Sequence, residues 1–349
     1  MFFNLDDKES KKLISLFNQH EKNIDYLLYL QGFLWQKPAF LKGGIKGEDR
    51  FQKRDYLFDS LEKEHPFPND FIKNNIKWDT QLIRVEDYLS NPYLTALKNV
   101  SFSKEGWSLE SKKLEAYSLF PFEEEYHYGS NYSLKMNLAY FDKDYFYPSI
   151  SLYDREWMSL NPYEIRTMET AVITARGKVL TLGLDLGYYA YMIHLKDEVK
   201  EIHIVEMDLE LINIFKEYLL SLFPHPEKIH IHKADAFHFA ENIKDRDYDF
   251  IFSDLWHDVG DGLGSYLKLK ACFDKFSFTK CHYWIESSII SYLRLLLIGV
   301  MKDEYYKVEN DYDDIQSLIK EKLQKYTISN SYDLDDLLNI QGLNRLIFN

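Results

Sequence analysis

Cysteine is scarce in this chain, which has only Cys272 and Cys281 among its 349 residues. Two cysteines are too few for a disulfide framework, and their spacing is not the doubled CxxC pattern of a structural zinc site. We therefore expect a protein of a reducing compartment, with no disulfide scaffold and no metal centre.

Glycine, proline and long apolar runs are also in short supply. The 14 glycines and 9 prolines fall well below the usual share of about 12%, while 46% of the residues are hydrophobic, so a packed protein is expected rather than a disordered one. The longest apolar stretch, near residues 295–301, is far short of the ~20 residues that span a bilayer. The N-terminus lacks the basic and apolar regions of a signal peptide. These patterns predict a cytoplasmic protein with no membrane partner.

Positive charge is outnumbered by negative charge. The chain has 42 Lys and Arg against 56 Asp and Glu, which gives a net charge of −14. No nucleic-acid partner is expected, because phosphate neutralisation needs a basic surface. Residues 1–100 hold 15 basic and 15 acidic side chains, so the whole excess lies in residues 101–349. We expect a small neutral or cationic substrate there. The sequence does not determine the oligomeric state, and a homodimer is one possibility.

The first part of the chain mixes helical and strand patterns. Apolar residues recur at helical spacing over residues 5–35 and predict one or two amphipathic helices. Alternating, aromatic-rich runs at 132–141 and 145–153 are separated by Asp142-Lys143-Asp144, which predicts a hairpin in a small antiparallel sheet.

From residue 178 onward short apolar runs alternate with helical segments. The predicted strands are 178–183, 201–206, 228–232, 248–254 and 281–286. The predicted helices are 162–175, one from about 188, 208–221, 236–241, 264–276, 289–302, 315–326 and 334–348. Five strands alternating with helices indicate an α/β fold with a doubly wound, Rossmann-like parallel sheet. The predicted domains are a helical and β-hairpin domain at 1–158 and a catalytic domain with a helical C-terminal extension at 159–349.

A glycine turn follows the first strand of this sheet. Ligands of such sheets bind at the carboxyl ends of the strands, so residues just past each strand are functional candidates. The segment Gly183-Leu184-Asp185-Leu186-Gly187 lets the backbone approach a ligand and points a helix N-terminus at it. A strand-to-helix corner also uses glycine for steric reasons alone. The spacing is not GxGxxG, which disfavours a nicotinamide dehydrogenase.

Acidic residues follow the second and third strands. Glu206 lies 23 residues past Gly183, where it would accept hydrogen bonds from the two hydroxyls of a ribose. Asp235, directly before Ala236, is placed to accept a hydrogen bond from an adenine amino group. A helix-start acid and a helix cap are the structural alternatives for these two side chains.

The fourth strand ends in a loop at 254–262 with several acids and one histidine. Asp254, His257 and Asp258 stand in it at the expected rim of the site. A solvated acidic loop is the alternative for this segment alone. Suitable groups at four successive strand ends together favour a nucleoside site.

The segments VLTLGLDLGYYAYM, IHIVEMD, KADAFHFA and YDFIFSDLWHDVGDG resemble, in order and spacing, the motifs of class I S-adenosylmethionine-dependent methyltransferases. The resemblance covers about residues 157–286. It is closest to the spermidine-synthase-like branch, whose fourth-strand loop typically reads Asp-Ser-Ser-Asp-Pro-Val-Gly. That branch also places a β-rich domain before its catalytic domain.

The resemblance implies S-adenosylmethionine as cofactor and a role for each motif. The implied cofactor residues are Gly183, Asp185 and Gly187 for the methionine part, Glu206 for the ribose, and Asp235 with Ala236 for the adenine. Asp254 would face the transferred group. Tyr163-Glu164 stands almost where the branch carries Tyr-His-Glu, which would bring Glu164 to the site, and a helix-start acid is its alternative.

We first interpret the chain as a methyltransferase acting on a small acceptor, with His257 as general base oriented by Asp254 or Asp258. An exposed loop histidine is the alternative for His257. Aminopropyl transfer to an amine is the second interpretation, favoured by the acidic balance but opposed because His257 replaces the second loop Asp of that branch. A non-catalytic nucleoside-binding or interaction protein is the third, favoured because Asp185 replaces a glycine of the turn and Thr181 replaces an acid before it.

Overall fold

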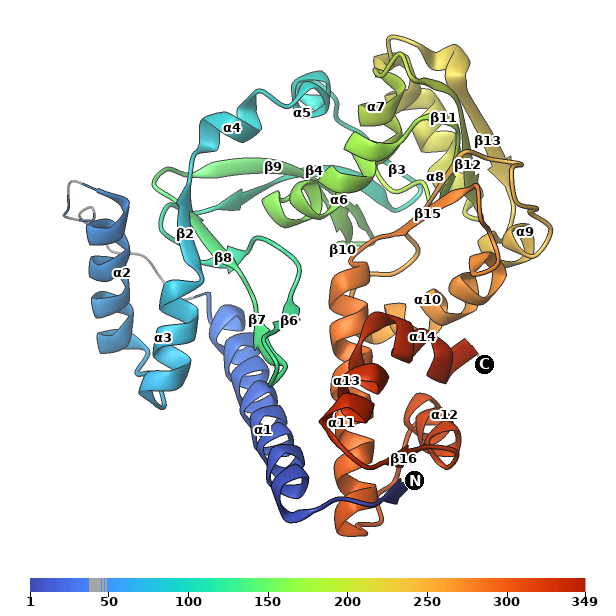
Figure 1. Ribbon diagram of the computed structural model, residues 1–349. Helices are drawn as coiled ribbons and strands as arrows, with labels where there is room; N and C mark the ends of the chain where they lie inside the picture. Colours follow the sequence, from blue (N-terminus) through green and yellow to red (C-terminus); the bar gives the residue numbers. More distant parts are fainter. Residues whose placement is uncertain (38–44, 46, 48, 349) are drawn as a thin grey trace. The chain divides into compact units, whose positions relative to one another are not determined.

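The computed structural model describes residues 1–37, 45, 47 and 49–348 (Figure 1). By its internal contacts the chain falls into two compact units. One unit combines residues 1–36 and 125–136 with the chain from 287 to the C-terminus, and the other comprises 37–124 and 137–286. The domain boundary near residue 158 stays a prediction.

A five-stranded parallel sheet forms the centre of the larger unit. Its strands are β11 (Gly177–Leu182), β12 (Val199–Glu206), β13 (Ile229–Lys233), β14 (Phe250–Ser253) and β15 (Lys280–Tyr283). Their order is β13-β12-β11-β14-β15, and every neighbouring pair is parallel. The predicted doubly wound sheet is thereby confirmed. The strand order reverses between β11 and β14, so the carboxyl ends of these two strands flank the crevice where such sheets bind ligands.

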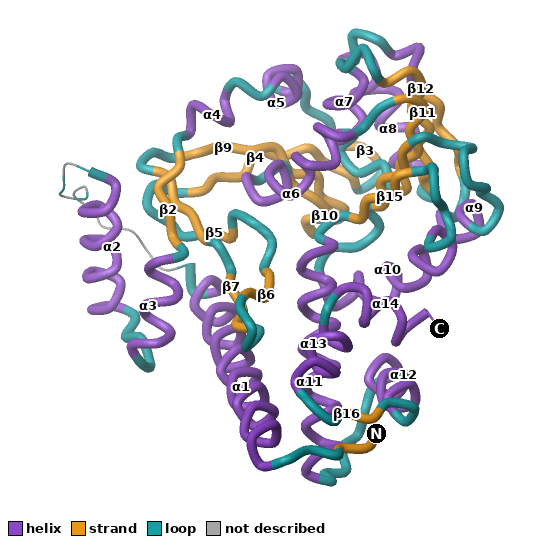
Figure 2. Tube along the Cα trace, viewed as in Figure 1, coloured by secondary structure: helices purple, strands orange, loops and turns teal. Residues whose placement is uncertain are grey.

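Helices connect the strands and pack beside the sheet (Figure 2). They are α6 (Pro162–Thr174), α7 (Tyr188–His194), α8 (Leu209–Ile214), α9 (Ala236–Ala240) and α10 (Val259–Phe273). The predicted helix 208–221 is shorter than expected, because α8 passes into a π-helical turn at Phe215–Leu219 and a short 3-10 turn at Leu220–Leu222. Helix α10 begins five residues before its predicted start, since Asp258 and Asp261 form a capping box.

Two smaller sheets and several helices precede the parallel sheet. The helices are α2 (Arg50–Glu64), α3 (Asp70–Trp78), α4 (Val85–Leu89) and α5 (Pro92–Leu97). The four-stranded sheet contains β3 (Ser103–Lys104), β4 (Trp107–Leu114), β9 (Tyr145–Leu152) and β10 (Arg155–Ser159). The three-stranded sheet contains β2 (Thr80–Ile83), β5 (Phe120–Pro121) and β8 (Leu138–Phe141).

The predicted hairpin between residues 132–141 and 145–153 is wrong. Strands β8 and β9 join different sheets, because β8 pairs with β2 and β5 while β9 pairs with β4 and β10. The hairpin turn lies one strand later, between β9 and β10. Tyr153 and Asp154 both have left-handed backbone conformations there, with φ of 48° and 63°, as a tight two-residue turn requires.

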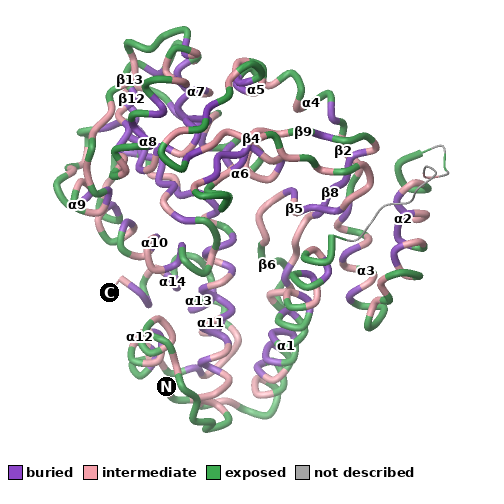
Figure 3. Tube along the Cα trace, turned by 180° about the vertical axis from the view of Figure 1, so that it is seen from behind, coloured by how far each residue is buried: buried purple, intermediate pink, exposed green. Residues whose placement is uncertain are grey.

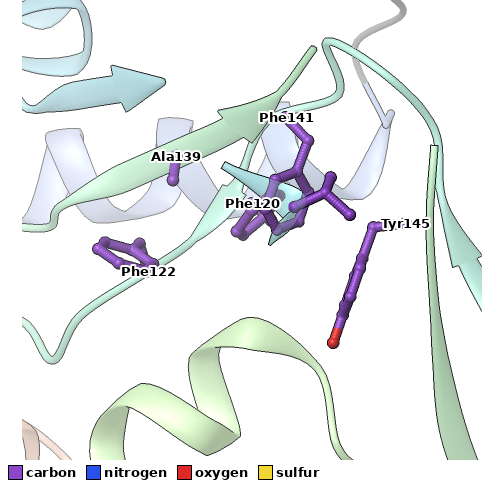
Figure 4. Packing of buried hydrophobic residues seen from close by; sticks show 6 residues of the cluster. Phe120, Phe122, Ala139, Phe141 and Tyr145 are labelled. Atoms are coloured by element: carbon purple, nitrogen blue, oxygen red, sulfur yellow. The ribbon is translucent and has the colours of Figure 1, made fainter. Parts of the chain in front are cut away.

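Aromatic residues fill the core between these sheets. Phe120, Phe122, Ala139, Phe141 and Tyr145 are buried together (Figure 4). The ring of Phe141 lies 5.2 Å from that of Phe120 and 5.0 Å from that of Tyr145. Core packing therefore accounts for these aromatic side chains.

The smaller unit is mainly helical. It contains α1 (Asp7–Trp35), α11 (Glu286–Tyr306), α12 (Asp314–Leu323), α13 (Ser331–Leu338) and α14 (Ile340–Phe348), with the short strands β1 (Phe2–Phe3), β6 (Tyr126–Tyr128), β7 (Ser133–Lys135) and β16 (Thr327–Ile328). Buried positions recur along α1 and α11 (Figure 3). The predicted helix 334–348 is interrupted at Asn339, whose side chain accepts a hydrogen bond from the Gly342 amide at 2.8 Å. Among the helices described here, none has the length and apolar character needed to cross a bilayer.

Candidate active site

The two glycines of the turn after β11 are required by close packing. Gly183 has φ of +103°, and a Cβ atom on it would lie 2.0 Å from the carbonyl oxygen of Asp254. Gly187 has φ of +75°, and its Cβ would lie 2.6 Å from the ring of Phe215. Both positions therefore exclude a side chain by conformation and by space. The turn holds the ends of β11 and β14 together at the crevice.

Asp185, the central residue of this turn, forms a hydrogen-bonded pair with Asp254. Asp185 has a left-handed backbone with φ of 48°, and its half-buried carboxyl shares a hydrogen bond with the buried carboxyl of Asp254. Burial, and then the charge of Glu206, raises the pKa of Asp185 to about 7. Burial, and then the charge of Asp185, raises the pKa of Asp254 well above its usual range. The pair therefore holds a proton near neutral pH, as two close carboxyls do.

Glu164 adds a third, half-buried carboxyl to the site. It lies in the first turn of α6, where Asn161 caps the helix by accepting hydrogen bonds from the amides of Tyr163 and Glu164. Burial, and then the charge of Asp185, raises the pKa of Glu164 to about 8. Glu164 is thus both a helix-start acid and a residue that lines the cavity.

Glu206 connects the end of β12 to the glycine turn. Its Oε2 accepts a hydrogen bond from the Leu184 amide at 3.3 Å, and its Oε1 accepts one from the Asp208 amide at 2.8 Å. Burial raises the pKa of Glu206, and these backbone hydrogen bonds oppose that shift. Each oxygen keeps a lone pair, so the carboxylate can still accept hydrogen bonds from two hydroxyls.

The loop after β14 has a different internal arrangement from the one expected. Asp258 caps α10 by accepting hydrogen bonds from the amides of Gly260 and Asp261. His257 lies against Asp261, whose Oδ2 is 3.1 Å from its Nδ1. Its ring meets that of Trp157 edge to face, with the centroids 5.3 Å apart. The carboxylate beside His257 is therefore that of Asp261, and neither Asp254 nor Asp258 takes that place.

Asp235 and Ala236 lie away from the other candidates. Asp235 is exposed and caps α9 by accepting a hydrogen bond from the His238 amide at 2.8 Å. Ala236 is buried in the first turn of that helix. Neither residue is among those that line the cavity, so their adenine role stays a prediction.

One cavity brings together six of the predicted residues, Glu164, Gly183, Asp185, Glu206, Asp254 and His257, whereas Gly187 and Asp258 are not among the residues that line it. Its volume is about 360 Å³, within the usual range for a small-molecule site. It is lined by Glu156, Trp157, Met158, Ser159, Asn161, Glu164, Gly183, Asp185, Glu206, Met207, Asp254, Leu255, Trp256, His257 and Trp284. Sequence reasoning missed Glu156 and Trp157, because it did not predict strand β10 that carries them. Nothing in the sequence indicated that Trp157 of β10 and Trp284, directly after β15, would line the same cavity as the strand-end acids.

The charge of the cavity is one-sided. Five of its lining residues are Asp or Glu, and none of those described in its wall is Lys or Arg. Burial and the neighbouring carboxylates raise the pKa values of Glu164, Asp185 and Asp254. At Asp185 the hydrogen bond with Asp254 and the charge of His257 oppose this shift in pKa. A cationic ligand would supply a positive partner for these carboxyls, whereas an anionic group would be repelled.

Comparison with known proteins identifies the central part of the chain. Residues 168–276 match the family model of the spermine/spermidine synthase domain. The resemblance to the spermidine-synthase-like branch is confirmed. The match covers under a third of the chain, and it includes β11 to β14 with the glycine turn and the loop after β14. No curated protein matches the chain.

Solved structures with a similar arrangement include two spermidine synthases. The enzyme from Thermotoga maritima has 13% sequence identity and a TM-score of 0.31, over 42% of this chain and 54% of that one. A spermidine synthase in complex with the transition state analogue AdoDATO has 14% identity and a TM-score of 0.30, over 38% of this chain and 47% of that one. The chain thus spans about half the length of each.

The first interpretation of the chain as a methyltransferase is wrong. The family model that matches is that of the spermine and spermidine synthases, which are aminopropyltransferases. The predicted use of S-adenosylmethionine as a methyl donor is therefore not supported either. The second interpretation, aminopropyl transfer to an amine, fits the matching family better. The acidic wall of the cavity also favours this second interpretation.

Proposed function

We propose that this chain transfers an aminopropyl group from decarboxylated S-adenosylmethionine to a small amine. The observation that carries the proposal is the cluster formed by the half-buried Glu164 and Asp185 with the buried Asp254 at the crevice between β11 and β14. Both substrates of this reaction are cations, and no Lys or Arg stands among the described residues of the wall around the cluster.

The acidic wall favours a decarboxylated donor. S-adenosylmethionine carries a carboxylate next to its ammonium group, and the described wall of the cavity offers no Lys or Arg to pair with it. The decarboxylated form keeps the ammonium and the sulfonium but lacks the carboxylate. Repulsion between like charges in a partly buried site therefore discriminates between the two donors.

Glu206 is placed to hold the ribose of that donor. Two backbone amides fix its carboxylate at the end of β12, so it needs no reorientation when two hydroxyls bind. Asp185 and Asp254 lie on the neighbouring strand ends, toward the part of the donor that carries positive charge. Asp235 keeps its proposed role beside the adenine base.

The transfer itself is a displacement at carbon. The acceptor nitrogen attacks the aminopropyl carbon next to the sulfonium, the new N–C bond forms, and the C–S bond breaks with its electron pair on sulfur. The products are methylthioadenosine and the aminopropylated amine. The acceptor arrives as an ammonium and must first lose a proton. Carboxyls with pKa values of about 7 and about 8, such as Asp185 and Glu164, are suited to accept it near neutral pH.

The replacement of the second loop Asp by His257 no longer opposes this activity. Asp261 brings a carboxylate to the same loop, at 3.1 Å from the His257 ring. Asp185 adds a carboxyl where a glycine would have none. Asp185 thus adds to the acidic character of the cavity wall, whereas Asp261 lies beside His257 and is not among the residues of that wall.

The test incubates the full chain with each of the two donors and a panel of diamines and polyamines, followed by mass spectrometry. We expect methylthioadenosine and an aminopropylated amine from the decarboxylated donor, and neither product from S-adenosylmethionine. The Glu227→Gln variant, altered at an exposed acid away from the cavity, should match the parent. S-adenosylhomocysteine as the product, or tight donor binding without turnover on the whole panel, would contradict the proposal.

A further inference from the structure

A second group of chemically active side chains lies on the outer strands of the parallel sheet. Strand β12 carries Glu201 and His203, and the edge strand β13 carries His230 and His232. His203 lies directly opposite His230 in the register of the two strands. Residues two apart on a strand share a face, so all four side chains project from the same face of the sheet.

Three of these side chains already converge. One potential ligand atom from each of Glu201, His203 and His230 lies within 4.8 Å of those of the other two. His203 Nε2 is 3.2 Å from Glu201 Oε2. Two ligands on a tetrahedral zinc ion are about 3.3 Å apart, which follows from metal–ligand bonds of about 2.0–2.1 Å. The Glu201–His203 pair therefore has the spacing of a ligand pair without any movement.

His232, the fourth side chain, contacts the ring nitrogen of His203 that does not face Glu201. His203 Nδ1 is 2.8 Å from His232 Nε2, and the two rings are stacked with centroids 5.0 Å apart. When Nδ1 of His203 carries the proton and donates it to His232, Nε2 presents its lone pair toward Glu201. A second hydrogen bond of this kind is what fixes the tautomer of metal-bound histidines.

We propose that Glu201, His203 and His230 bind a divalent transition metal ion such as Zn²⁺, with His232 orienting His203. Two imidazoles and one carboxylate are a donor set that suits Zn²⁺ and its neighbours in the first transition row. Glu201 and His230 are exposed, so an ion can reach the site from solvent and keep a water in its fourth position. The ion would link the edge strand β13 to β12. This site is separate from the cavity and does not depend on the proposed reaction.

Lys178 is the neighbour that weakens metal binding. It faces Glu201 across the β11–β12 pair, with its Nζ 3.9 Å from Glu201 Oε2. Its ammonium group repels a divalent ion, and it partly neutralises the carboxylate. Removal of this charge in Lys178→Met should tighten the binding of the metal at least severalfold if Glu201 is a ligand.

The test titrates Zn²⁺ alone into the metal-free full chain by calorimetry, with Co²⁺ absorption as a report on coordination. We expect one equivalent to bind. The His203→Ala and His230→Ala variants should lose this event, and His232→Ala should weaken it by about 10- to 100-fold. Saturating Zn²⁺ should raise the melting temperature of the parent but not that of His203→Ala.

Three control variants separate this site from other acidic or histidine groups. His238→Ala and His225→Ala each remove an exposed histidine beside a glutamate, and Asp254→Asn alters the carboxyl cluster of the cavity. All three should bind Zn²⁺ like the parent. Binding that survives in His203→Ala and His230→Ala, or that is lost in Asp254→Asn, would overturn the proposal. Matching circular dichroism spectra of the metal-free variants would exclude misfolding as the cause.

Discussion

The carboxyl groups of Asp185 and Asp254 share a hydrogen bond, although 69 positions separate the two residues in the chain. Asp185 belongs to the turn after β11 and Asp254 to the loop after β14, and the two strands are neighbours in the sheet. Two carboxyls so close cannot both be charged at little cost, so one proton stays between them near neutral pH. A bound cation removes that cost.

Asp254→Asn should abolish most of the proposed transfer. The amide keeps the shape of the side chain but can neither become charged beside an ammonium group nor accept its proton. Turnover should fall by about 10²–10⁴-fold in the mass-spectrometric assay. Asp311→Asn, at an exposed position, is the matched control. A folded Asp254→Asn variant with turnover within tenfold of the parent would remove Asp254 from the reaction.

Glu206→Gln should weaken the binding of the donor and of methylthioadenosine. The loss of a charge-assisted hydrogen bond of roughly 1.5–3 kcal/mol corresponds to at least tenfold in affinity. Calorimetric titration with methylthioadenosine measures this without turnover. Glu210→Gln, an exposed acid in the first turn of α8, is the control. Equal affinities in the Glu206 variant and the parent would rule out the ribose contact.

Asp185→Gly should separate stability from binding. Glycine adopts the left-handed conformation more readily than Asp does, and the substitution removes a half-buried acid whose pKa is raised. The variant should therefore melt at a higher temperature while it binds the decarboxylated donor more weakly. Thermal unfolding and calorimetry on the same preparation measure both effects. A glycine variant that binds the donor more tightly than the parent would show that Asp185 has no part in recognising it.

The stability of the empty chain should fall as the pH rises from about 5 to 8. The raised pKa values of Asp185 and Glu164, about 7 and about 8, mean that the folded chain keeps protons that the unfolded chain releases above about pH 4. Stability present at acid pH is then lost as these carboxyls ionise in the folded state. As the pH rises across this range, the melting temperature of the Asp185→Asn variant should decline less steeply than that of the parent chain. Identical slopes for variant and parent would contradict the shift.

Gly183→Ala should prevent stable folding. The added Cβ would lie 2.0 Å from the backbone oxygen of Asp254, and the residue also has φ of +103°. Gly264→Ala is a matched control within helix α10, because nothing lies within 4 Å of its Cβ position. Alanine there should stabilise the chain by about 0.5–1 kcal/mol. Urea unfolding of the two variants would give the comparison, and a Gly183→Ala chain as stable as the parent would refute the close approach.

The parallel sheet could be predicted because each of its strands has a local pattern. Runs such as 178–183 and 201–206 are short, apolar and rich in β-branched residues, and helical segments of regular length separate them. Strand pairing in the β-rich part lacked such a signal. The order of β8 and β9 depends on long-range contacts, and the turn at Tyr153 and Asp154 has neither the glycine nor the asparagine that usually indicates a left-handed pair.

The sequence predicted where most residues of the candidate site lie, but it did not predict which of them interact with one another. The rule that ligands bind at strand ends selected Asp185, Glu206 and Asp254, which the cavity brings together. The rule could not show that Asp185 and Asp254 share a proton, because that depends on the left-handed turn and on side-chain packing. The capping box of α10 likewise determined that Asp261 lies beside His257. His203 and His230 converge only because the register of β12 and β13 places them opposite each other.

Because Asp185 and Asp254 share a proton, a cation that binds in the cavity should displace that proton. Each positive charge that the cavity admits lowers the cost of ionising a carboxyl, so a proton leaves as the cation arrives. The apparent affinity for a cation then increases over the same pH range in which the empty chain becomes less stable. Above neutral pH a bound cation would therefore supply part of the stability of the folded chain, in the way that a counterion stabilises a compact polyelectrolyte.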